Sequence, residues 1–404
     1  MAARSARPVP FVKRIRIKNY RSIAECDVSL GPLTVLLGFN ASGKSNFLDA
    51  LRFVADALTT TPEQAIDGRG GLDSLLCAVP ERADSFEIRL ELVLDDGPEG
   101  DGFEADYGFE IRRDHTGELP FVISWERLDV EWPEGPVGFT VESGLLVQVP
   151  GPGDPVPVTR QGGQLHLPVL AATQRPFAHA AASLRRMCFY DFDPAMLCAL
   201  DDTGTRHGRM RPLGPAGEYL GRVLGELELD EPPVKERLDG YLSALVPGAL
   251  GVDERREGRY STVQARFQVG DTDETEVFLR ESLSEGTVRA AGVLAALFQY
   301  PVFHGRVPLV GIEEPETALH PATVGGLYEA LHDASSRTQV IVTSQSSDLL
   351  DNEYADPSHI RVVENVDGLT RVGEIDQGGR AVLDKGLMTL AELHRSGQMR
   401  PEAG

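Results

Sequence analysis

The sequence predicts an α/β fold that combines a mixed sheet, an antiparallel β meander and an inserted, mainly helical lobe. Three observations predict it. Between residues 287 and 343, helical and strand patterns alternate, as in a parallel sheet with helices on its faces. Between 86 and 132, apolar residues recur at every second position in successive segments, as in an antiparallel meander. From 167 to 245 the pattern is mainly helical, with Pro and Gly interruptions.

The strands and helices are expected in a definite order along the chain. The first half is predicted to contain strands at 12–18, 23–30 and 33–37, a helix at 45–58, and meander strands at 86–94, 107–111 and 121–132. A Gly- and Pro-rich stretch at 133–163 predicts loops with a weak hairpin. The second half is predicted to contain strands within 252–280 and at 309–312 and 340–343, with helices at 287–300 and 322–335.

The composition is that of a globular protein. The chain has 404 residues, of which 41% are hydrophobic and 25% charged, which is enough for two or three parts with cores of their own. No apolar run is long enough to span a bilayer, and no apolar signal core precedes the first strand. We therefore expect a cytoplasmic protein without membrane contact. Its four cysteines are too far apart for a zinc site and are expected to stay reduced.

The formal net charge of −23 is unevenly distributed. Residues 1–60 carry nine Lys and Arg against four Asp and Glu, whereas the remainder carries 30 against 58. Because phosphate neutralisation supplies most of the affinity for duplex DNA, so acidic a chain is poorly suited to coat DNA. One basic stretch is either a local nucleic-acid contact or the solvated face of an edge strand, so nucleic-acid binding stays open. It comprises Lys13, Arg14, Arg16, Lys18 and Arg21.

Residues 38–45 read Gly-Phe-Asn-Ala-Ser-Gly-Lys-Ser, a complete phosphate-binding loop between a strand and a helix. The glycines let the loop curl so that backbone N–H groups point at a polyphosphate, which the positive end of the next helix also faces. Lys44 would neutralise the β- and γ-phosphates, and the Ser45 hydroxyl would ligate Mg²⁺. An ordinary Gly/Ser turn is the alternative. The nucleotide-binding residues are predicted to be Gly38, Asn40, Ala41, Ser42, Gly43, Lys44, Ser45 and Asn46.

An apolar strand downstream, Val307–Ile312, ends in Glu313 and Glu314. Hydrolysis needs such a pair, because one carboxylate holds the Mg²⁺ shell while the next orients and deprotonates the attacking water. A parallel strand beside that of the phosphate loop would deliver both at the edge where α/β sheets bind ligands. The alternative is that the two glutamates only begin a turn before Pro315.

Two further segments place polar residues beside a predicted element, one before a helix and the other after a strand. Ser284 is a natural N-cap for the helix that starts near Thr287, and it would leave the Gly286 N–H free for an anion. A helix cap without further function is the alternative. The buried strand Val340–Thr343 leads into Ser344 and Gln345, beside the other strand ends.

Together these motifs resemble the ABC-type ATPase superfamily, in particular its soluble SMC-like and RecF-like branch, whose predicted ATPases are called AAA-21 or OLD-like. The resemblance extends from about residue 12 to 365 and implies a P-loop ABC-type ATPase head. The segments that carry it are 17–22, 37–46, 283–287, 311–321 and 343–346.

The resemblance also implies a division into four parts. Residues 1–150 would be the N-terminal half of the head, with the P-loop and the meander, and 151–250 the mainly helical insert. Residues 251–375 would be the C-terminal half with signature, Walker B and switch strands, and 376–404 a partly helical tail.

Residue roles follow from the same resemblance. It implies that Lys44 and Ser45 bind phosphate and Mg²⁺, that Glu313 holds the metal and that Glu314 is the catalytic base. Ser284, Glu285 and Gly286 would act in trans on ATP held by a second subunit, which implies a homodimer with a head-to-tail ATP sandwich. Gln345 stands where many relatives have the switch histidine. Since an amide cannot carry a proton or a positive charge, we expect slow hydrolysis.

The function that the resemblance implies is an ATPase with ATP and Mg²⁺ as cofactors. Its ATP-bound dimer would act as a switch for a partner effector, such as a separately encoded nuclease, in phage defence or DNA repair. About forty residues follow the strand at 361–363, too few for a fused nuclease domain, so none is expected on this chain. Two alternatives remain, a nucleotide-binding subunit of a membrane transporter and a non-hydrolysing ATP-binding scaffold.

Overall fold

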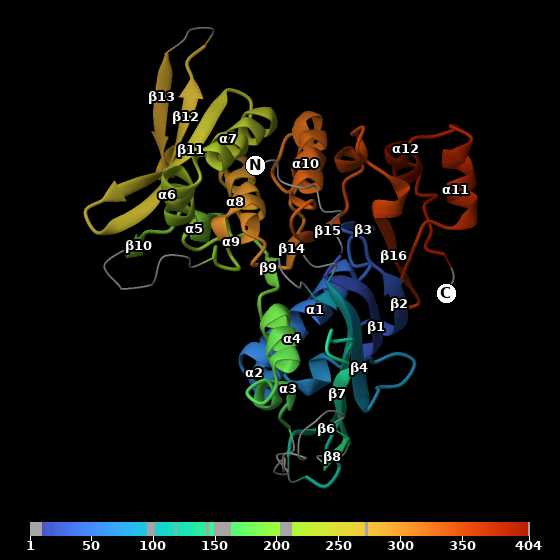
Figure 1. Cartoon of the computed structure of the whole chain (residues 1–404). Helices are drawn as coiled ribbons and strands as arrows, with labels where there is room; N and C mark the ends of the chain where they lie inside the picture. The colour runs from blue at the N-terminus through green and yellow to red at the C-terminus, as the bar shows by residue number, and fades with distance from the viewer. Residues whose placement is uncertain are drawn as a thin grey trace.

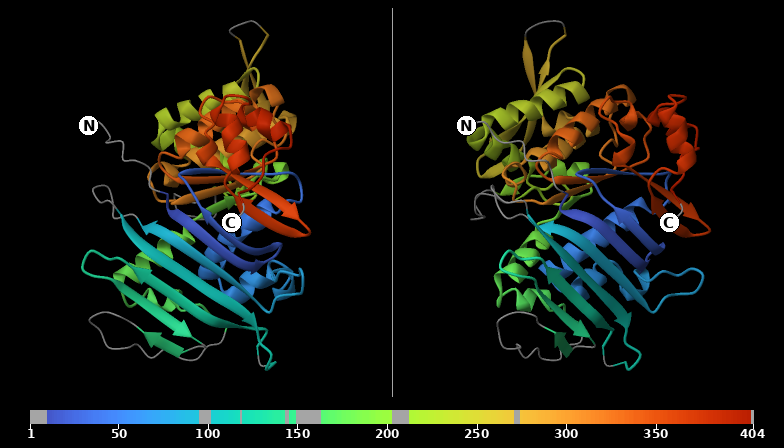
Figure 2. Two further views of the ribbon diagram at one scale, coloured as in Figure 1. Left: turned by 90° about the vertical axis from the view of Figure 1, so that its right-hand side faces the viewer. Right: turned by 45° about the vertical axis from the view of Figure 1, so that its right-hand side comes forward.

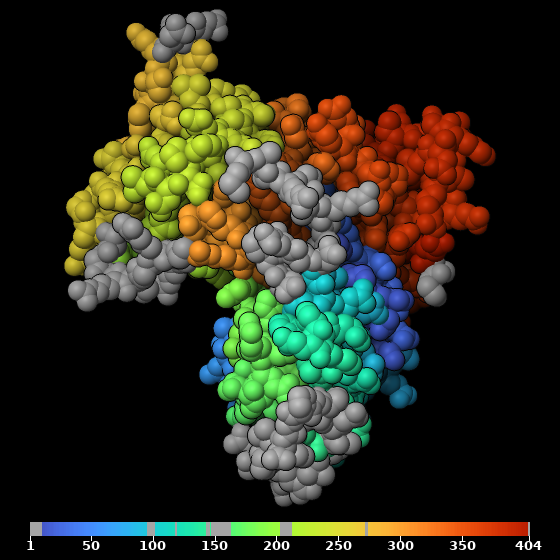
Figure 3. Space-filling model, in the orientation of Figure 1, coloured from blue at the N-terminus to red at the C-terminus, as the bar shows by residue number. Residues whose placement is uncertain are grey.

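The computed structural model describes residues 10–94, 102–117, 119–142, 145–148, 163–202, 212–270 and 274–402. These residues form two parts, one above the other in Figure 1. An antiparallel sheet and helices α1 (Lys44–Thr59) and α4 (Arg175–Arg185) make up the lower part. A mixed sheet lies between it and the helices of the upper part. In Figure 3, the yellow residues around β11–β13 and the red C-terminal residues lie at opposite ends of the upper part.

The antiparallel sheet is the predicted meander, extended at both ends. Its seven strands run in the order β2-β1-β4-β5-β6-β7-β8. In β4 every second residue is buried, since one face packs on α4 and its Phe86 ring packs on Phe53 of α1. Figure 2 shows these helices on one face of the sheet and, in the part of the chain that the structure describes, none on the other. The strands are β1 (Val12–Tyr20), β2 (Ile23–Ser29), β4 (Ser85–Leu94), β5 (Phe103–Arg113), β6 (Phe121–Val130), β7 (Val137–Glu142) and β8 (Leu145–Gln148).

The mixed sheet has six strands in the order β17-β16-β3-β15-β14-β9. All neighbours are parallel except β16 and β17. Consequently the carboxyl ends of β3, β14 and β15 meet at one edge, where open α/β sheets bind ligands. The strands are β3 (Leu33–Leu37), β9 (Cys188–Tyr190), β14 (Leu309–Glu313), β15 (Gln339–Ser344), β16 (Ile360–Val366) and β17 (Leu369–Gly373).

Successive residues of the mixed sheet face two different cores. Leu36 and Ile341 belong to the lower core with α1, whereas Val35 and Val342 belong to the upper core with α8 (Glu285–Phe298) and α10 (Pro321–Ala334). Burial on both faces explains why these strands read as continuous apolar runs. The predicted α/β class with a mixed sheet and a meander is therefore confirmed.

The region 167–245 was predicted to be mainly helical, but it also contains strands and contributes to both cores. The three-residue strand β9 lies in it and joins the mixed sheet beside β14. Helices α3 (Leu167–Leu170) and α4 pack into the lower core, but α6 (Leu220–Asp230) and α7 (Pro232–Leu245) pack into the upper one. A strand of three residues has no detectable periodicity, which is why the sequence did not indicate it. The four-part division stays a prediction.

The third sheet lies beside α6 and α7, and four strands form it: β10 (Asp201–Asp202), β11 (Ala249–Glu257), β12 (Tyr260–Gln268) and β13 (Thr275–Leu279). The hairpin predicted within 133–163 corresponds to β7 and β8, while residues 149–162 lie outside those described. The remaining helices are α2 (Pro62–Asp67), α5 (Pro194–Leu197), α9 (Tyr300–Phe303), α11 (Gln377–Asp384) and α12 (Leu390–Arg395). Among the described residues, no helix combines the length and apolarity that crossing a membrane requires.

Candidate functional site

The phosphate loop connects β3 to α1 at the ligand-binding edge of the mixed sheet. Gly43 has a φ of 101°, and a Cβ there would lie 1.9 Å from Thr370 Oγ1, so this position requires glycine. No side chain caps α1. The N–H groups of its first turn therefore remain available to an anion.

A chain of side-chain hydrogen bonds holds the loop from the side of β17. The Thr370 hydroxyl donates to the Ser42 carbonyl oxygen at 2.9 Å. Ser22 Oγ lies 2.7 Å from Thr370 Oγ1 and accepts from the Asn46 amide at 2.6 Å. Asn46 was predicted to bind nucleotide, but its side chain donates to Ser22, which belongs to the 17–22 segment. In this structure Asn46 therefore supports the loop.

Lys44 lies inside the loop and is 5% exposed. Its ammonium donates to the carbonyl oxygens of Gly38 at 2.9 Å and Phe39 at 3.0 Å. Burial lowers the pKa of Lys44. Three carboxylates oppose this shift, in decreasing order those of Glu314, Glu316 and Glu313. The loop lysine and the carboxylates at and just after the end of β14 therefore act on each other within one site.

The two predicted carboxylates differ in their surroundings. Glu313 is the last residue of β14, and burial raises its pKa, although a hydrogen bond from Ser45 opposes the rise. Arg52 lies 3.9 Å from the Glu313 carboxylate. Glu314 has a φ of 40°, and its N–H is held by Thr343 at the end of β15. Glu314 thus adopts a left-handed backbone conformation directly after the strand, held by a contact to the neighbouring strand.

Gln345 lies next to Glu314, with Nε2 3.5 Å from a Glu314 carboxylate oxygen. A third carboxylate, that of the buried Glu316, accepts from the Ser344 hydroxyl at 2.6 Å and from the Gln345 N–H at 3.2 Å. Burial raises the pKa of Glu316, and these hydrogen bonds oppose the rise. Glu316 thus ties the end of β15 to the loop after β14.

The predicted signature segment lies at the start of α8. Ser284 is the N-cap, as expected, and its Oγ accepts from the Thr287 N–H at 3.2 Å. Glu285 pairs with Arg289 at 2.9 Å. A Cβ on Gly286 would lie 2.5 Å from the Ala318 carbonyl oxygen, so α8 begins against the loop after β14. These contacts are all with residues outside the phosphate loop, and the role of the segment in a second subunit stays a prediction.

The sequence does not indicate the roles of several residues at this site. Ser22 and Glu316 lie within the segments that carry the resemblance, but the motifs alone predict no role for either. Thr370 and His394 lie outside those segments. The Ser42 hydroxyl and one Glu316 oxygen are buried without a hydrogen-bond partner among the described residues. Only a residue's neighbours in space reveal these roles, and an isolated Thr or His has no sequence signal for them.

The donor atoms fit a magnesium ion that comes with its nucleotide. The Ser45 hydroxyl and the Glu313 carboxylate are hard oxygen donors, which Mg²⁺ prefers. Across the described ranges, no group of three or more His, Cys, Asp or Glu residues could hold a metal. Since Mg²⁺ usually keeps several waters and takes oxygens from phosphates, two protein ligands suffice.

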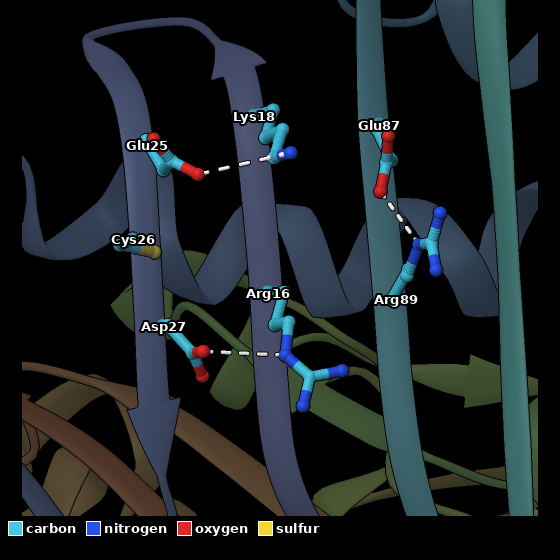
Figure 4. Close-up of a pocket in the computed structure, with 7 residues that line it drawn as sticks. All are labelled: Arg16, Lys18, Glu25, Cys26, Asp27, Glu87 and Arg89. Atoms are coloured by element: carbon cyan, nitrogen blue, oxygen red, sulfur yellow. Dashed lines mark hydrogen bonds and ion pairs between the residues drawn. The ribbon is translucent and has the colours of Figure 1, made fainter.

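The basic stretch of β1 is neutralised by acidic partners. Arg16 and Lys18 pair with Asp27 and Glu25 of β2, at 3.2 and 3.7 Å (Figure 4). The other pairs are Lys13 with Glu104, Arg14 with Asp27, and Arg21 with Asp49. The contacts favour the interpretation as a solvated face. The expected edge position is wrong, however, because β1 lies between β2 and β4.

Two family models match the chain. Residues 11–92 match AAA_15, described as an AAA ATPase domain. Residues 207–351 match AAA_21, described as "AAA domain, putative AbiEii toxin, Type IV TA system". The first match contains the phosphate loop, and the second contains Ser284, Glu314 and Gln345.

Curated relatives match parts of the chain. The DNA replication and repair protein RecF of Gloeobacter violaceus is 29% identical over 130 residues, which are 31% of this chain and 34% of that protein. The OLD nuclease of Thermus scotoductus is 41% identical over 44 residues, 11% of this chain and 8% of that protein. The match thus spans about a third of RecF and less than a tenth of the OLD nuclease.

Solved structures share the fold over most of the chain. An SMC head bound to the C-terminal winged-helix domain of ScpA superposes with a TM-score of 0.54 at 15% identity, covering 92% of this chain and all of that one. An SMC head with an extended coiled coil, bound to the C-terminal domain of ScpA derived from Pyrococcus furiosus, superposes with a TM-score of 0.50 at 14% identity. This match covers 94% of this chain and all of that one. The chain thus has the fold of SMC heads, and its sequence is similar to RecF and to AAA-type ATPase domains over parts of its length.

Proposed function

We propose that this chain binds ATP with Mg²⁺ and hydrolyses it slowly, in an ATP-sandwich homodimer that switches a partner effector. One observation carries the proposal. The strands before Lys44 and Glu314, β3 and β14, both pair in parallel with β15, and Gln345 after β15 lies 3.5 Å from the Glu314 carboxylate. This arrangement supports phosphate-binding and water-activating roles for groups at one edge of the mixed sheet.

Each residue has a definite part in the proposed reaction. Lys44 and the N–H groups at the start of α1 bind the phosphates, while Ser45 and Glu313 would hold Mg²⁺, which supplies charge neutralisation when bound. Glu314 accepts a proton from the attacking water, and Gln345 orients that water or the γ-phosphate by hydrogen bonds. Since Gln345 stays neutral, it adds no positive charge to the transition state, and turnover is slow.

The proposed sandwich supplies the signature segment from a second copy. Ser284 and Gly286 would contact the γ-phosphate bound to the partner, with the N-terminus of the 14-residue helix α8 pointing at it. Because the γ-phosphate would be the link between subunits, hydrolysis would release the dimer. The effector would be a separately encoded protein such as a nuclease, in DNA repair or phage defence. The resemblance to RecF and the OLD nuclease supports this class of partner.

Phosphate release by the wild type and by Glu314→Gln tests hydrolysis. Loss of the base should lower kcat by about 10²- to 10⁴-fold. Glu87→Gln, on the outer face of the antiparallel sheet, is the matched control and should keep the wild-type rate. Equal background rates in the wild type and Glu314→Gln would mean that the chain is an ATP-binding scaffold.

Size-exclusion chromatography of Glu314→Gln with ATP and Mg²⁺ tests the dimer. This variant should bind ATP without turnover and should therefore accumulate as a dimer at micromolar concentration. A monomer under these conditions would exclude the sandwich. A pull-down with this variant, with and without ATP, should then recover an effector only in the presence of ATP.

A further inference from the structure

The C-terminal helix α12 packs against the phosphate loop through His394. The His394 ring stacks on Phe39, with a centroid distance of 5.7 Å and an interplanar angle of 22°. Phe39 is 61% exposed, whereas His394 is 5% exposed. The imidazole thus supports one face of an otherwise exposed aromatic ring within the loop.

The same histidine reaches the segment that follows β15. His394 Nδ1 lies 2.8 Å from the hydroxyl of Ser347, two residues beyond Gln345. The next residue, Arg395, pairs with Asp348 at 3.1 Å and with Asp351 at 3.6 Å. One short helix therefore holds both the phosphate loop and the segment of the switch glutamine.

The other ring nitrogen has no partner. His394 Nε2 is buried and has no hydrogen bond among the described residues, and the same is true of Ser42 Oγ. Both residues line a cavity of about 210 Å³ beside the loop, together with Asn40 and Asn365.

Lys44 links the phosphate loop to the imidazole through Phe39. Its ammonium donates to the carbonyl oxygens of Gly38 and Phe39 and, since an ammonium has three donors, keeps one for a phosphate. A phosphate bound to Lys44 would therefore act on the Phe39 peptide. Any displacement of Phe39 acts on the stacked imidazole, which is in turn bonded to Ser347.

We propose that His394 is a positioning residue that couples the phosphate loop to the segment 345–348, which follows β15 and begins with Gln345. Gln345 is then aligned only when the loop holds nucleotide. This inference rests on the proposed ATPase function. His394 acts through Phe39 on one side and Ser347 on the other, and the tail residues become part of the nucleotide switch.

The kinetic test uses the full chain and two single variants. His394→Phe keeps an aromatic ring against Phe39 but loses the bond to Ser347, and Ser347→Ala removes the other end of that bond. Each should lower kcat about tenfold with KM unchanged, because only the alignment of Gln345 is lost. The double variant should be no worse than either single one. His394→Asn, which restores a hydrogen-bonding group opposite Ser347, should recover part of the rate.

His332→Phe is the matched control, since His332 stacks on Tyr354 in the same manner but contacts neither segment. It should keep the wild-type kcat. Wild-type kcat in both His394→Phe and Ser347→Ala, or effects that simply add in the double variant, would overturn the proposal.

Hydrogen–deuterium exchange of the wild type gives a readout apart from activity. A non-hydrolysable ATP analogue should protect peptides covering 38–46 and should also change exchange over 389–396. Protection of 38–46 with unchanged exchange over 389–396 would overturn the coupling and leave the ATPase proposal intact. Unchanged exchange in both regions would overturn the proposed nucleotide binding itself.

Discussion

Thr370 and Ser42 are 328 residues apart in the chain, yet the Thr370 hydroxyl donates a hydrogen bond to the Ser42 carbonyl oxygen at 2.9 Å. Since the only hydroxyl hydrogen of Thr370 is used there, Ser22 must donate to Thr370 and accept from Asn46. The phosphate loop is therefore braced by the last strand of the mixed sheet and by the turn between β1 and β2.

Thr370→Val should destabilise the fold, because it leaves the buried Ser42 carbonyl without its partner. The expected loss is about 1–3 kcal/mol of unfolding free energy. Urea denaturation measures it, and Thr370→Ser, which keeps the hydroxyl, is the control. Equal midpoints for the valine and serine variants would show that the brace contributes nothing.

Lys44→Ala should weaken ATP binding. A hydrogen bond to a charged group contributes about 1.5–3 kcal/mol, so the affinity should fall by roughly 10- to 100-fold. Titration calorimetry measures the affinity. Lys13→Ala, which removes an exposed lysine paired with Glu104, should bind as the wild type does. Unchanged affinity in Lys44→Ala would remove the loop from the proposed function.

Ser284→Asp should prevent the ATP-dependent dimer of the Glu314→Gln protein. Aspartate is as good an N-cap as serine, so α8 keeps its cap, but a carboxylate would then face the γ-phosphate of the partner. Ser284→Asn keeps the cap without a charge and serves as the control. Light scattering with ATP should show monomer for the aspartate variant alone. A dimer there would place the signature segment outside the interface.

The docking of α12 should weaken at acid pH. Burial lowers the pKa of His394 below its ordinary value of 6.5, and the positive charges of Lys44 and Arg395 lower it further. Because the unfolded chain takes up this proton more readily, the contribution is complete above pH 6.5 and is lost as the pH falls through the lower folded pKa. Between pH 7.5 and 5.0, the unfolding free energy should therefore fall further for the wild type than for His394→Phe, as urea denaturation would measure. Equal losses of unfolding free energy would contradict the lowered pKa of His394.

The sequence predicted most of the mixed sheet and of the meander, since long elements with strict alternation or continuous apolar runs have clear signals. It also predicted Ser284 as a helix cap, because local chemistry determines a cap. Strand β9 could not be predicted, because three residues are too few to show a periodicity. The partners of Asn46 and His394 could not be predicted, since Ser22 and Ser347 come close to them only after the chain has folded.

The position of β3 has a consequence for biosynthesis. Its two neighbours in the sheet, β15 and β16, begin at Gln339 and Ile360, whereas the lysine of the loop is residue 44. A nascent chain that has not yet reached residue 339 has no strand to pair with β3, and an unpaired strand is not stable by itself. The sheet edge that carries the phosphate loop can therefore be assembled only when most of the chain has left the ribosome.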